Sequence, residues 1–191
     1  MAIFSLDKIK ASQEWFKKAI NAVKSTINGV LKPEMPFSES LARLTPRYIG
    51  RMVMFYYDPK WKDDEKVLPY YDTFPLVILV NLKKDRFHGL NLHYLPPALR
   101  VQLLAALMRT YENKHLDERR RLEMDYQMLK STRRLRYFAP CFKEYIYSHV
   151  RSKYNIVKPA EWHHVSTLRL ERFVRATNQR VWEESRRKIG L

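Results

Sequence analysis

Apolar residues recur with two different periods along this chain, and the change of period divides it into parts. Between residues 5 and 31 they fall mostly three and four positions apart, which predicts an amphipathic helix. Lysines fill much of its other face, and a solvated face explains them more simply than a contact with phosphate. Three prolines interrupt residues 32–49, so we expect a linker there, with a short turn or helix near residues 38–44.

The strand signal is concentrated between residues 50 and 111. Runs rich in β-branched and aromatic residues predict three strands, namely Arg51–Tyr57, Phe74–Leu82 and Phe87–Tyr94. A polar turn at Lys83–Arg86 joins the last two, Gly89 could mark a bulge, and the charged segment Lys60–Lys66 is long enough to be an exposed loop. The short connections predict an antiparallel three-stranded sheet over about residues 51–94. Prolines 96 and 97 then open a helix that should cover one face of this sheet.

Residues 112–191 are basic and mostly helical in pattern. We expect one helix over Phe142–Tyr154 and another over Leu170–Ile189. The predicted fold is therefore α+β, with a small antiparallel three-stranded sheet flanked by helices and a helical C-terminal half. Its four parts are an N-terminal amphipathic helix (1–31), a linker (32–49), a sheet-plus-helix core (50–111) and a basic helical region that packs on the core (112–191).

Charge indicates the kind of partner. The 191 residues include 36 Lys and Arg against 20 Asp and Glu, a formal net charge of +16. A soluble protein this basic usually meets a polyanion such as nucleic acid, although the charge could also serve assembly alone. No apolar run approaches the ~20 residues of a membrane span, and the single cysteine, Cys141, excludes an intrachain disulfide. We expect a soluble protein made in the cytoplasm, with no membrane partner.

Arginines are the candidate DNA-binding residues, because a guanidinium binds phosphate through paired hydrogen bonds. Aromatic residues lie among them and could stack on bases exposed at a DNA end, although aromatics at helical spacing are more often core. Glutamates in the same segments offer the arginines an alternative use in ion pairs within a helix. The candidates are Arg119, Arg120, Arg121, Arg133, Arg134, Arg136, Arg172, Arg175, Arg180, Arg186 and Arg187.

Signals for catalysis are weak. The acids Asp58, Asp63, Asp64 and Glu65, followed by Lys66, loosely imitate the acid and lysine arrangement of a metal-dependent nuclease. They fall in a charged loop, however, and a solvated loop explains them more simply. The six histidines lack zinc-site spacing, and glycine-rich phosphate loops and nucleophile motifs are absent. We therefore predict no enzyme, no cofactor, no metal and no small-molecule substrate.

Several motifs in the strand-rich segment resemble small virion proteins of large contractile-tailed (T-even-like) bacteriophages, in particular their DNA end protector or head-completion class. The matching residues are Tyr57–Lys60, Leu68–Asp72, Phe74–Val77, Gly89–Pro97 and Arg100. The resemblance implies a non-enzymatic virion component that contacts double-stranded DNA at the genome ends, with other virion proteins as partners. It would be made in the host cytoplasm and located in the virion.

A structural assembly protein of the baseplate, neck or tail tube, with a basic surface that docks on other virion proteins, is the main alternative. A metal-dependent nuclease is a third.

Overall fold

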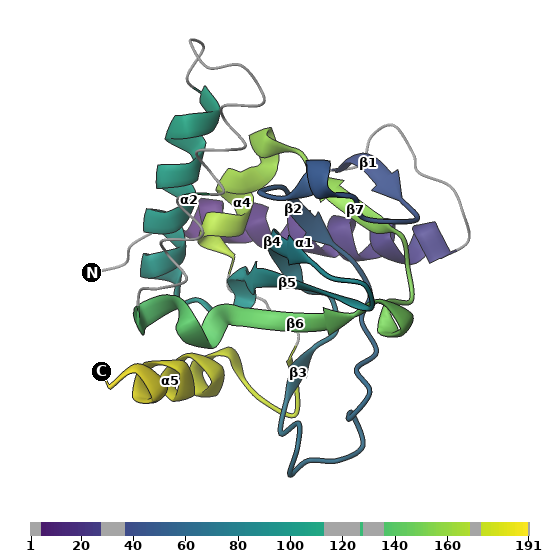
Figure 1. The fold of residues 1–191 in the computed structure, drawn as a ribbon. Helices are drawn as coiled ribbons and strands as arrows, with labels where there is room; N and C mark the ends of the chain where they lie inside the picture. Colours follow the sequence, from purple (N-terminus) through teal and green to yellow (C-terminus); the bar gives the residue numbers. More distant parts are fainter. Residues whose placement is uncertain (1–4, 28–36, 113–126, 128–135, 169–172, 191) are drawn as a thin grey trace.

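A six-stranded antiparallel sheet forms the centre of the molecule (Figure 1). The computed structural model describes residues 5–27, 37–112, 127, 136–168 and 173–190. The strand order is β1-β7-β2-β4-β5-β6, and β3 pairs with β8 in a separate two-stranded ladder. The strands are β1 (Phe37–Leu41), β2 (Met52–Met54), β3 (Tyr71–Asp72), β4 (Leu76–Leu82), β5 (Arg86–Asn91), β6 (Phe142–Ile146), β7 (Tyr154–Val157) and β8 (Phe173–Val174).

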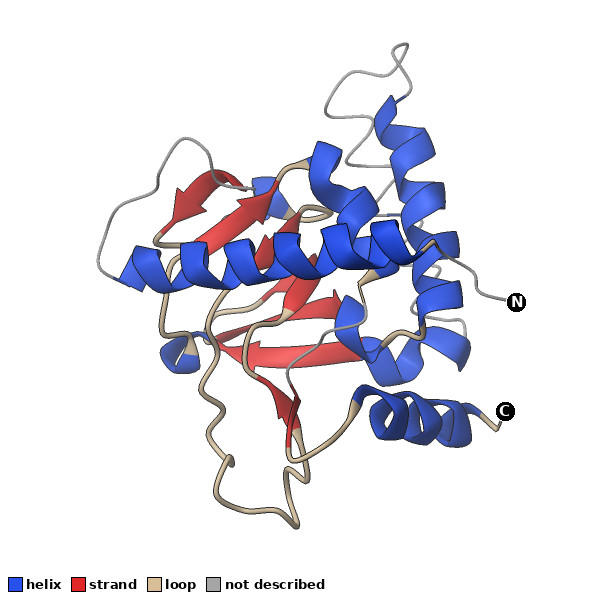
Figure 2. Ribbon diagram, turned by 180° about the vertical axis from the view of Figure 1, so that it is seen from behind, coloured by secondary structure: helices blue, strands red, loops and turns tan. Residues whose placement is uncertain are grey.

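One face of the sheet is covered by helices, with α1 crossing it in Figure 2. Phe16 and Ala19 of α1 are buried in one cluster with Met54 and Ile78 of the sheet and Leu104 of α2. This burial explains the apolar stripe of the first helix. The helices are α1 (Leu6–Ile27), α2 (Pro97–Glu112), α4 (Trp162–Thr167) and α5 (Asn178–Ile189). Single 3₁₀ turns lie at η1 (Pro46–Tyr48), η2 (Leu92–Tyr94), η4 (Tyr147–His149) and η5 (Pro159–Glu161), with a longer one at η3 (Arg136–Cys141).

The other face of the sheet curls around an aromatic cluster of its own. Phe55 lies at the centre, with ring centroids 5.2 Å from Tyr145, 5.4 Å from Phe87 and 5.6 Å from Tyr154. Phe87 and Tyr154 belong to strands separated by two others, which would lie about 14 Å apart in a flat sheet. Their ring centroids are nevertheless 5.8 Å apart, so the sheet must curl strongly.

Beyond the end of β2, backbone hydrogen bonds join the chain to the segment that follows β6, and so stabilise the curled shape of the sheet. The Arg151 N–H donates to the Tyr56 carbonyl (2.9 Å) and the Asp58 N–H to the His149 carbonyl (3.0 Å). Tyr57 forms an antiparallel bridge with Val150. The segment that joins β6 to β7 is thereby tied to the start of the loop between β2 and β3. In Figure 1 this loop and β3 hang below β6.

The α+β class is confirmed, and so is the antiparallel trio β2, β4 and β5. The prediction of only three strands is wrong, since β1, β6 and β7 extend the same sheet. β1 lies in the segment expected to be a linker, where Phe37 pairs with Val157. The helix expected over Phe142–Tyr154 is wrong as well, because this stretch forms β6, η4 and the start of β7.

Two element boundaries also differ from the pattern. The strand expected to reach Tyr94 ends at Asn91, whose side chain accepts the His93 N–H (2.9 Å) and caps a 3₁₀ turn. The last helix starts only at Asn178, because Arg175 has a positive φ of 67° and Thr177 caps the helix by accepting the Arg180 N–H.

Gly89 lies opposite Leu79, next to a register irregularity on β4 between Leu79 and Asn81. A β-carbon at Gly89 would collide with Val77 Cγ1 and would lie 2.7 Å from the Ile78 carbonyl oxygen. Glycine is therefore required by the close approach of β4.

Candidate nucleic-acid interface

A groove of about 260 Å³ lies between β6 and the loop that joins β2 to β3. Aromatic rings and lysines dominate its lining, together with the carboxylates of Asp72 and Glu144. We call it the aromatic groove and define it by Tyr57, Lys60, Trp61, Tyr71, Tyr94 and Lys143. Its residues come from distant parts of the chain, and the curl of the sheet brings them together.

Lys143 is the unusual charge of the groove. Its ammonium lies 3.8 Å from the centre of the Tyr94 ring, in a cation–π contact. Burial lowers the pKa of Lys143 from its ordinary 10.5 to about 8, with the nearby positive charge of Lys188 acting in the same direction. Within the described part of the chain, no carboxylate forms an ion pair with it. A partly buried cation without a counter-ion is costly, and an anionic ligand would remove that cost.

Both acids of the groove are already engaged. Glu144 pairs with Arg86 (2.7 Å) and His88 (2.6 Å), and these partners lower its pKa. Asp72 is buried and accepts hydrogen bonds from three donors. Neither carboxylate therefore neutralises Lys143.

Trp61 is the exposed ring at the mouth of the groove. Its side chain is 51 % exposed, and the Lys60 ammonium lies 4.7 Å from the centre of its ring. The loop that carries it is held by the Leu68 N–H donating to the Asp64 carbonyl (2.8 Å) and by an ion pair between Lys62 and Asp58 (3.0 Å). An exposed indole on a braced loop is suited to stacking on a flat ligand.

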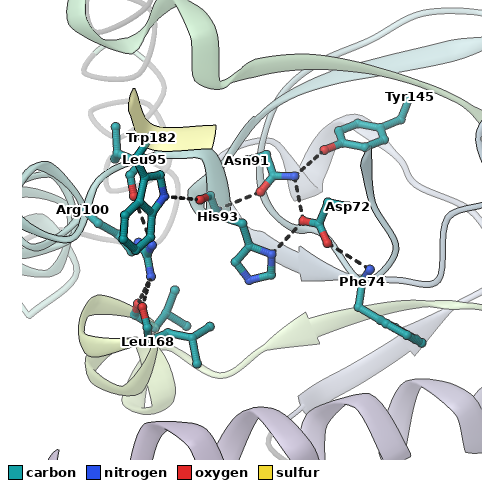
Figure 3. Close-up of polar contacts among 10 residues, drawn as sticks. Asp72, Phe74, Asn91, His93, Leu95, Arg100, Tyr145, Leu168 and Trp182 are labelled. Atoms are coloured by element: carbon teal, nitrogen blue, oxygen red, sulfur yellow. Dashed lines mark hydrogen bonds and ion pairs between the residues drawn. The ribbon is translucent and has the colours of Figure 1, made fainter. Parts of the chain in front are cut away.

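A buried polar network supports the wall of the groove (Figure 3). Asp72 Oδ2 accepts from His93 Nδ1 (2.7 Å) and Asn91 Nδ2 (3.0 Å), while Oδ1 accepts the Phe74 N–H (3.1 Å). Asn91 Nδ2 also donates to the Tyr145 hydroxyl (2.9 Å). Because a carboxylate only accepts, His93 carries its proton on Nδ1. The network joins β3, β5 and β6, and so fixes the two sides of the groove relative to each other.

A family model described as Phage T4 terminal DNA protecting protein matches residues 6–185 of the chain. The chain belongs to this family. A search of curated proteins and a search of solved structures gave no match. The match to the terminal DNA protecting family includes every residue of the aromatic groove and ends one residue before Arg186.

Only some of the eleven arginines that the sequence suggested as DNA-binding residues lie near one another in the structure. Arg119, Arg120, Arg121, Arg133, Arg134 and Arg172 lie outside the described residues, and Arg136 is the first residue of η3. Arg180 pairs with Glu184 (2.9 Å). Arg186 and Arg187 are exposed beside Lys188 in the last turn of α5. Among the described residues, this helix end is the one place where two of the predicted arginines lie together.

Arg175 has a structural role in the described part of the chain. Its guanidinium donates to the Leu68 carbonyl (2.8 Å), pairs with Glu65 (3.3 Å) and lies 5.8 Å from the centre of the Tyr71 ring. It therefore braces the loop that carries Trp61.

Arg100 also has a structural role, and unlike Arg175 it is fully buried. Arg100 donates to the carbonyls of Leu168 (2.7 Å), Val165 (3.3 Å) and Leu95 (3.0 Å), and Trp182 covers it while donating to the His93 carbonyl (2.8 Å). This charge joins α2, α4 and α5 (Figure 3).

The acids between β2 and β3 that loosely imitate a nuclease site have structural roles in the loop. Asp58 pairs with Lys62, and Asp64 accepts the N–H groups of Lys66 (3.0 Å) and Val67 (3.3 Å). Among the described residues there is no group of three or more potential metal ligands. The helices within this same part of the chain include none long and apolar enough to cross a membrane.

Sequence reasoning did not identify Lys143 or the network of Asp72, Asn91 and His93 as parts of a site. Asp72 accepts the Phe74 N–H two residues on, as the aspartate of a turn often does. The signal for the network was weak but present: Asn91 and His93 are polar residues of one parity inside an apolar run. Nothing local marks Lys143, because its surroundings come from other segments.

Proposed function

We propose that this protein is a non-enzymatic component of a phage virion that binds the ends of double-stranded DNA. The description of its family speaks of terminal DNA, and a net charge of +16 suits a polyanionic partner. One observation supports the aromatic groove as the site. It holds Lys143, a partly buried cation without a carboxylate partner among the described residues, and Trp61 lies exposed at its mouth.

The ends of a duplex differ from its interior because the last base pair exposes the face of its bases. Trp61 can stack on that face, and one stacked base is worth about 1–3 kcal/mol. Lys60 and Lys143 would then meet the phosphates of the terminal nucleotide. The groove volume of about 260 Å³ lies below the roughly 300–1,000 Å³ that enclose a drug-sized ligand. It therefore suits a terminal group better than a length of duplex.

The exposed arginines would neutralise phosphates farther from the end. Arg186 and Arg187 are the described members of this set, with Arg180 also exposed beside its ion pair. The arginines outside the described residues stay in the proposal on their sequence alone. Other virion proteins would hold the complex in the particle, and a covered end would be closed to an exonuclease.

The test compares a linear duplex with a covalently closed circle of matched length across a salt series. The wild-type protein should prefer the linear form and should slow its digestion by an exonuclease. Trp61→Ala should remove most of this preference, by a factor of about 5–150 if a single stacking contact is lost. Val67→Ala is the matched control, since Val67 is also exposed (57 %) on the same loop but does not line the groove.

Equal wild-type binding to both forms would rule out end recognition. Absence of binding to either form at physiological salt would instead favour the assembly protein, whose basic surface docks on other virion proteins.

A separate incubation of the protein and DNA with Mg²⁺ tests for catalysis. Intact DNA is the expected result for a protein that is not an enzyme. Cleavage that is lost in Asp58→Ala and Asp64→Ala would establish the nuclease.

A further inference from the structure

A second groove, of about 570 Å³, opens where β6 ends. One wall is the turn between β4 and β5, and the other is the segment that follows β1. We call it the basic groove and define it by Arg43, Lys83, Lys84, Tyr147 and Tyr154. Its volume is within the range of ligand sites in proteins.

Every charged residue that lines the basic groove is a cation. Arg43, Lys83 and Lys84 are all exposed, and within the described residues none of them forms an ion pair. The nearby carboxylates have other partners: Asp85 pairs with Arg86 (2.7 Å), and Glu39 accepts from the Tyr48 hydroxyl (2.8 Å).

The floor of the groove adds neutral hydroxyl groups. Tyr147 and Tyr154 are buried enough that desolvation raises the pKa of each. A tyrosine hydroxyl is protonated at physiological pH even at its ordinary pKa of about 10, and a protonated hydroxyl can donate to an anion. Three cations that form no ion pair among the described residues, together with phenolic hydroxyls, match the charge and the acceptor oxygens of a phosphodiester backbone.

The two grooves adjoin along the chain. Ile146 lines the aromatic groove and Tyr147, the next residue, lines the basic groove. Consecutive α-carbons are about 3.8 Å apart, so the linings of the two grooves meet at the end of β6. An acidic protein surface would be a poorer match, because it rarely presents a regular row of charges along which a groove can run.

We propose that the basic groove binds the phosphate backbone of the same DNA whose end lies in the aromatic groove. This inference rests on the proposed function, and it divides the work between the two sites. The aromatic groove distinguishes an end from the interior of a duplex. The basic groove adds affinity that is independent of ends and of sequence, and that falls with salt because counterions are released.

The test uses the triple variant Arg43→Gln, Lys83→Gln and Lys84→Gln with the linear duplex and the closed circle. Affinity for both forms should fall by the same factor, so that the ratio between them is kept. The slope of log affinity against log salt should become shallower by about 2–3, at roughly 0.9 per lost contact. The matched control removes the same charge from the exposed face of α1 through Lys10→Gln, Lys17→Gln and Lys18→Gln.

An unchanged slope, or a change no larger than that of the α1 control, would overturn the basic groove. Its failure is separable from that of the end-binding proposal. A wild-type preference for the linear form with an unchanged slope in the triple variant would reject only the basic groove. Equal wild-type binding to both forms with a shallower slope in the variant would reject only end recognition. All three positions are exposed, so the thermal unfolding of the variant should match that of the wild-type protein and exclude misfolding.

Discussion

Replacing Lys143 by methionine should stabilise the protein while weakening its hold on DNA. Methionine keeps the length of the side chain and its contact with Tyr94 but has no charge to desolvate. The pKa of Lys143 is lowered from 10.5 to about 8, and each pKa unit corresponds to about 1.4 kcal/mol. The cost of the charge is therefore at most about 3.5 kcal/mol, and we expect about 1–3 kcal/mol because the side chain is only partly buried.

The pH dependence isolates this cost from the other effects of the substitution. Below pH 8 the lysine is protonated in both the folded and the unfolded chain, so the full cost is present. Between pH 8 and 10.5 the unfolded chain binds more protons than the folded one, so the stability of the wild-type protein rises with pH. The advantage of Lys143→Met should consequently shrink by up to about 2 kcal/mol between pH 7 and pH 9.5.

Urea unfolding of both proteins at these two pH values measures that change. Other groups that titrate in this range, the tyrosines above all, are common to both proteins and largely cancel. A stability difference that is the same at pH 7 and pH 9.5 would show that Lys143 is not desolvated. A variant that is less stable than the wild type at pH 7 would mean that the cation–π contact with Tyr94 outweighs the burial of the charge.

Four further results are expected. If DNA neutralises Lys143, binding at pH 8.5 should take up a large fraction of one proton per complex, measured by calorimetry in buffers of different ionisation enthalpy, and Lys143→Met should take up none. Gly89→Ala should lower the free energy of unfolding by about 1–3 kcal/mol, because its new carbon meets Val77. Asp72→Ala leaves three buried donors without their acceptor and should cost about 3 kcal/mol in urea unfolding. Thr177→Ala removes the cap of α5 and should cost about 1 kcal/mol in the same assay.

The strongly periodic elements could be predicted from the sequence. The first helix was expected over residues 5–31 and is observed as Leu6–Ile27, and the most apolar run contains β4. In both, local pattern and tertiary packing favour the same structure. The turn at Lys83–Arg86 is likewise observed, with the Lys83 N–H donating to the Arg86 carbonyl (2.8 Å).

Strands β6 and β7 could not be predicted, because their local pattern favours the wrong element. Phe142, Ile146, Val150 and Tyr154 are spaced by four, as on one face of a helix. Their extended structure is imposed by pairing with β5, β2 and β1, which lie far away in sequence. Tertiary contacts of this kind override local preference.

The candidate site was only partly visible in the sequence for a related reason. Net charge indicated a polyanionic partner, but a count of arginines does not distinguish a free guanidinium from one that braces the fold. Arg175 and Arg100 are both held by backbone carbonyls. Lys143, by contrast, becomes distinctive only when Tyr94 and the loop of Trp61 are placed around it.

The position of β7 between β1 and β2 also sets an order in time. In the described sheet β1 is joined to the other strands only through β7, and the chain runs from Leu41 to Val157 between them. At about 5–20 residues per second, synthesis of this interval takes roughly 6–23 s. During that time β7 has not yet been made, so β1 and the edge of β2 have no strand to pair with. The loop of Trp61 likewise lacks Lys143, the residue of β6 that lines the same groove. A chain still emerging from the ribosome therefore has neither groove complete until Lys143, Tyr147 and Tyr154 have been made.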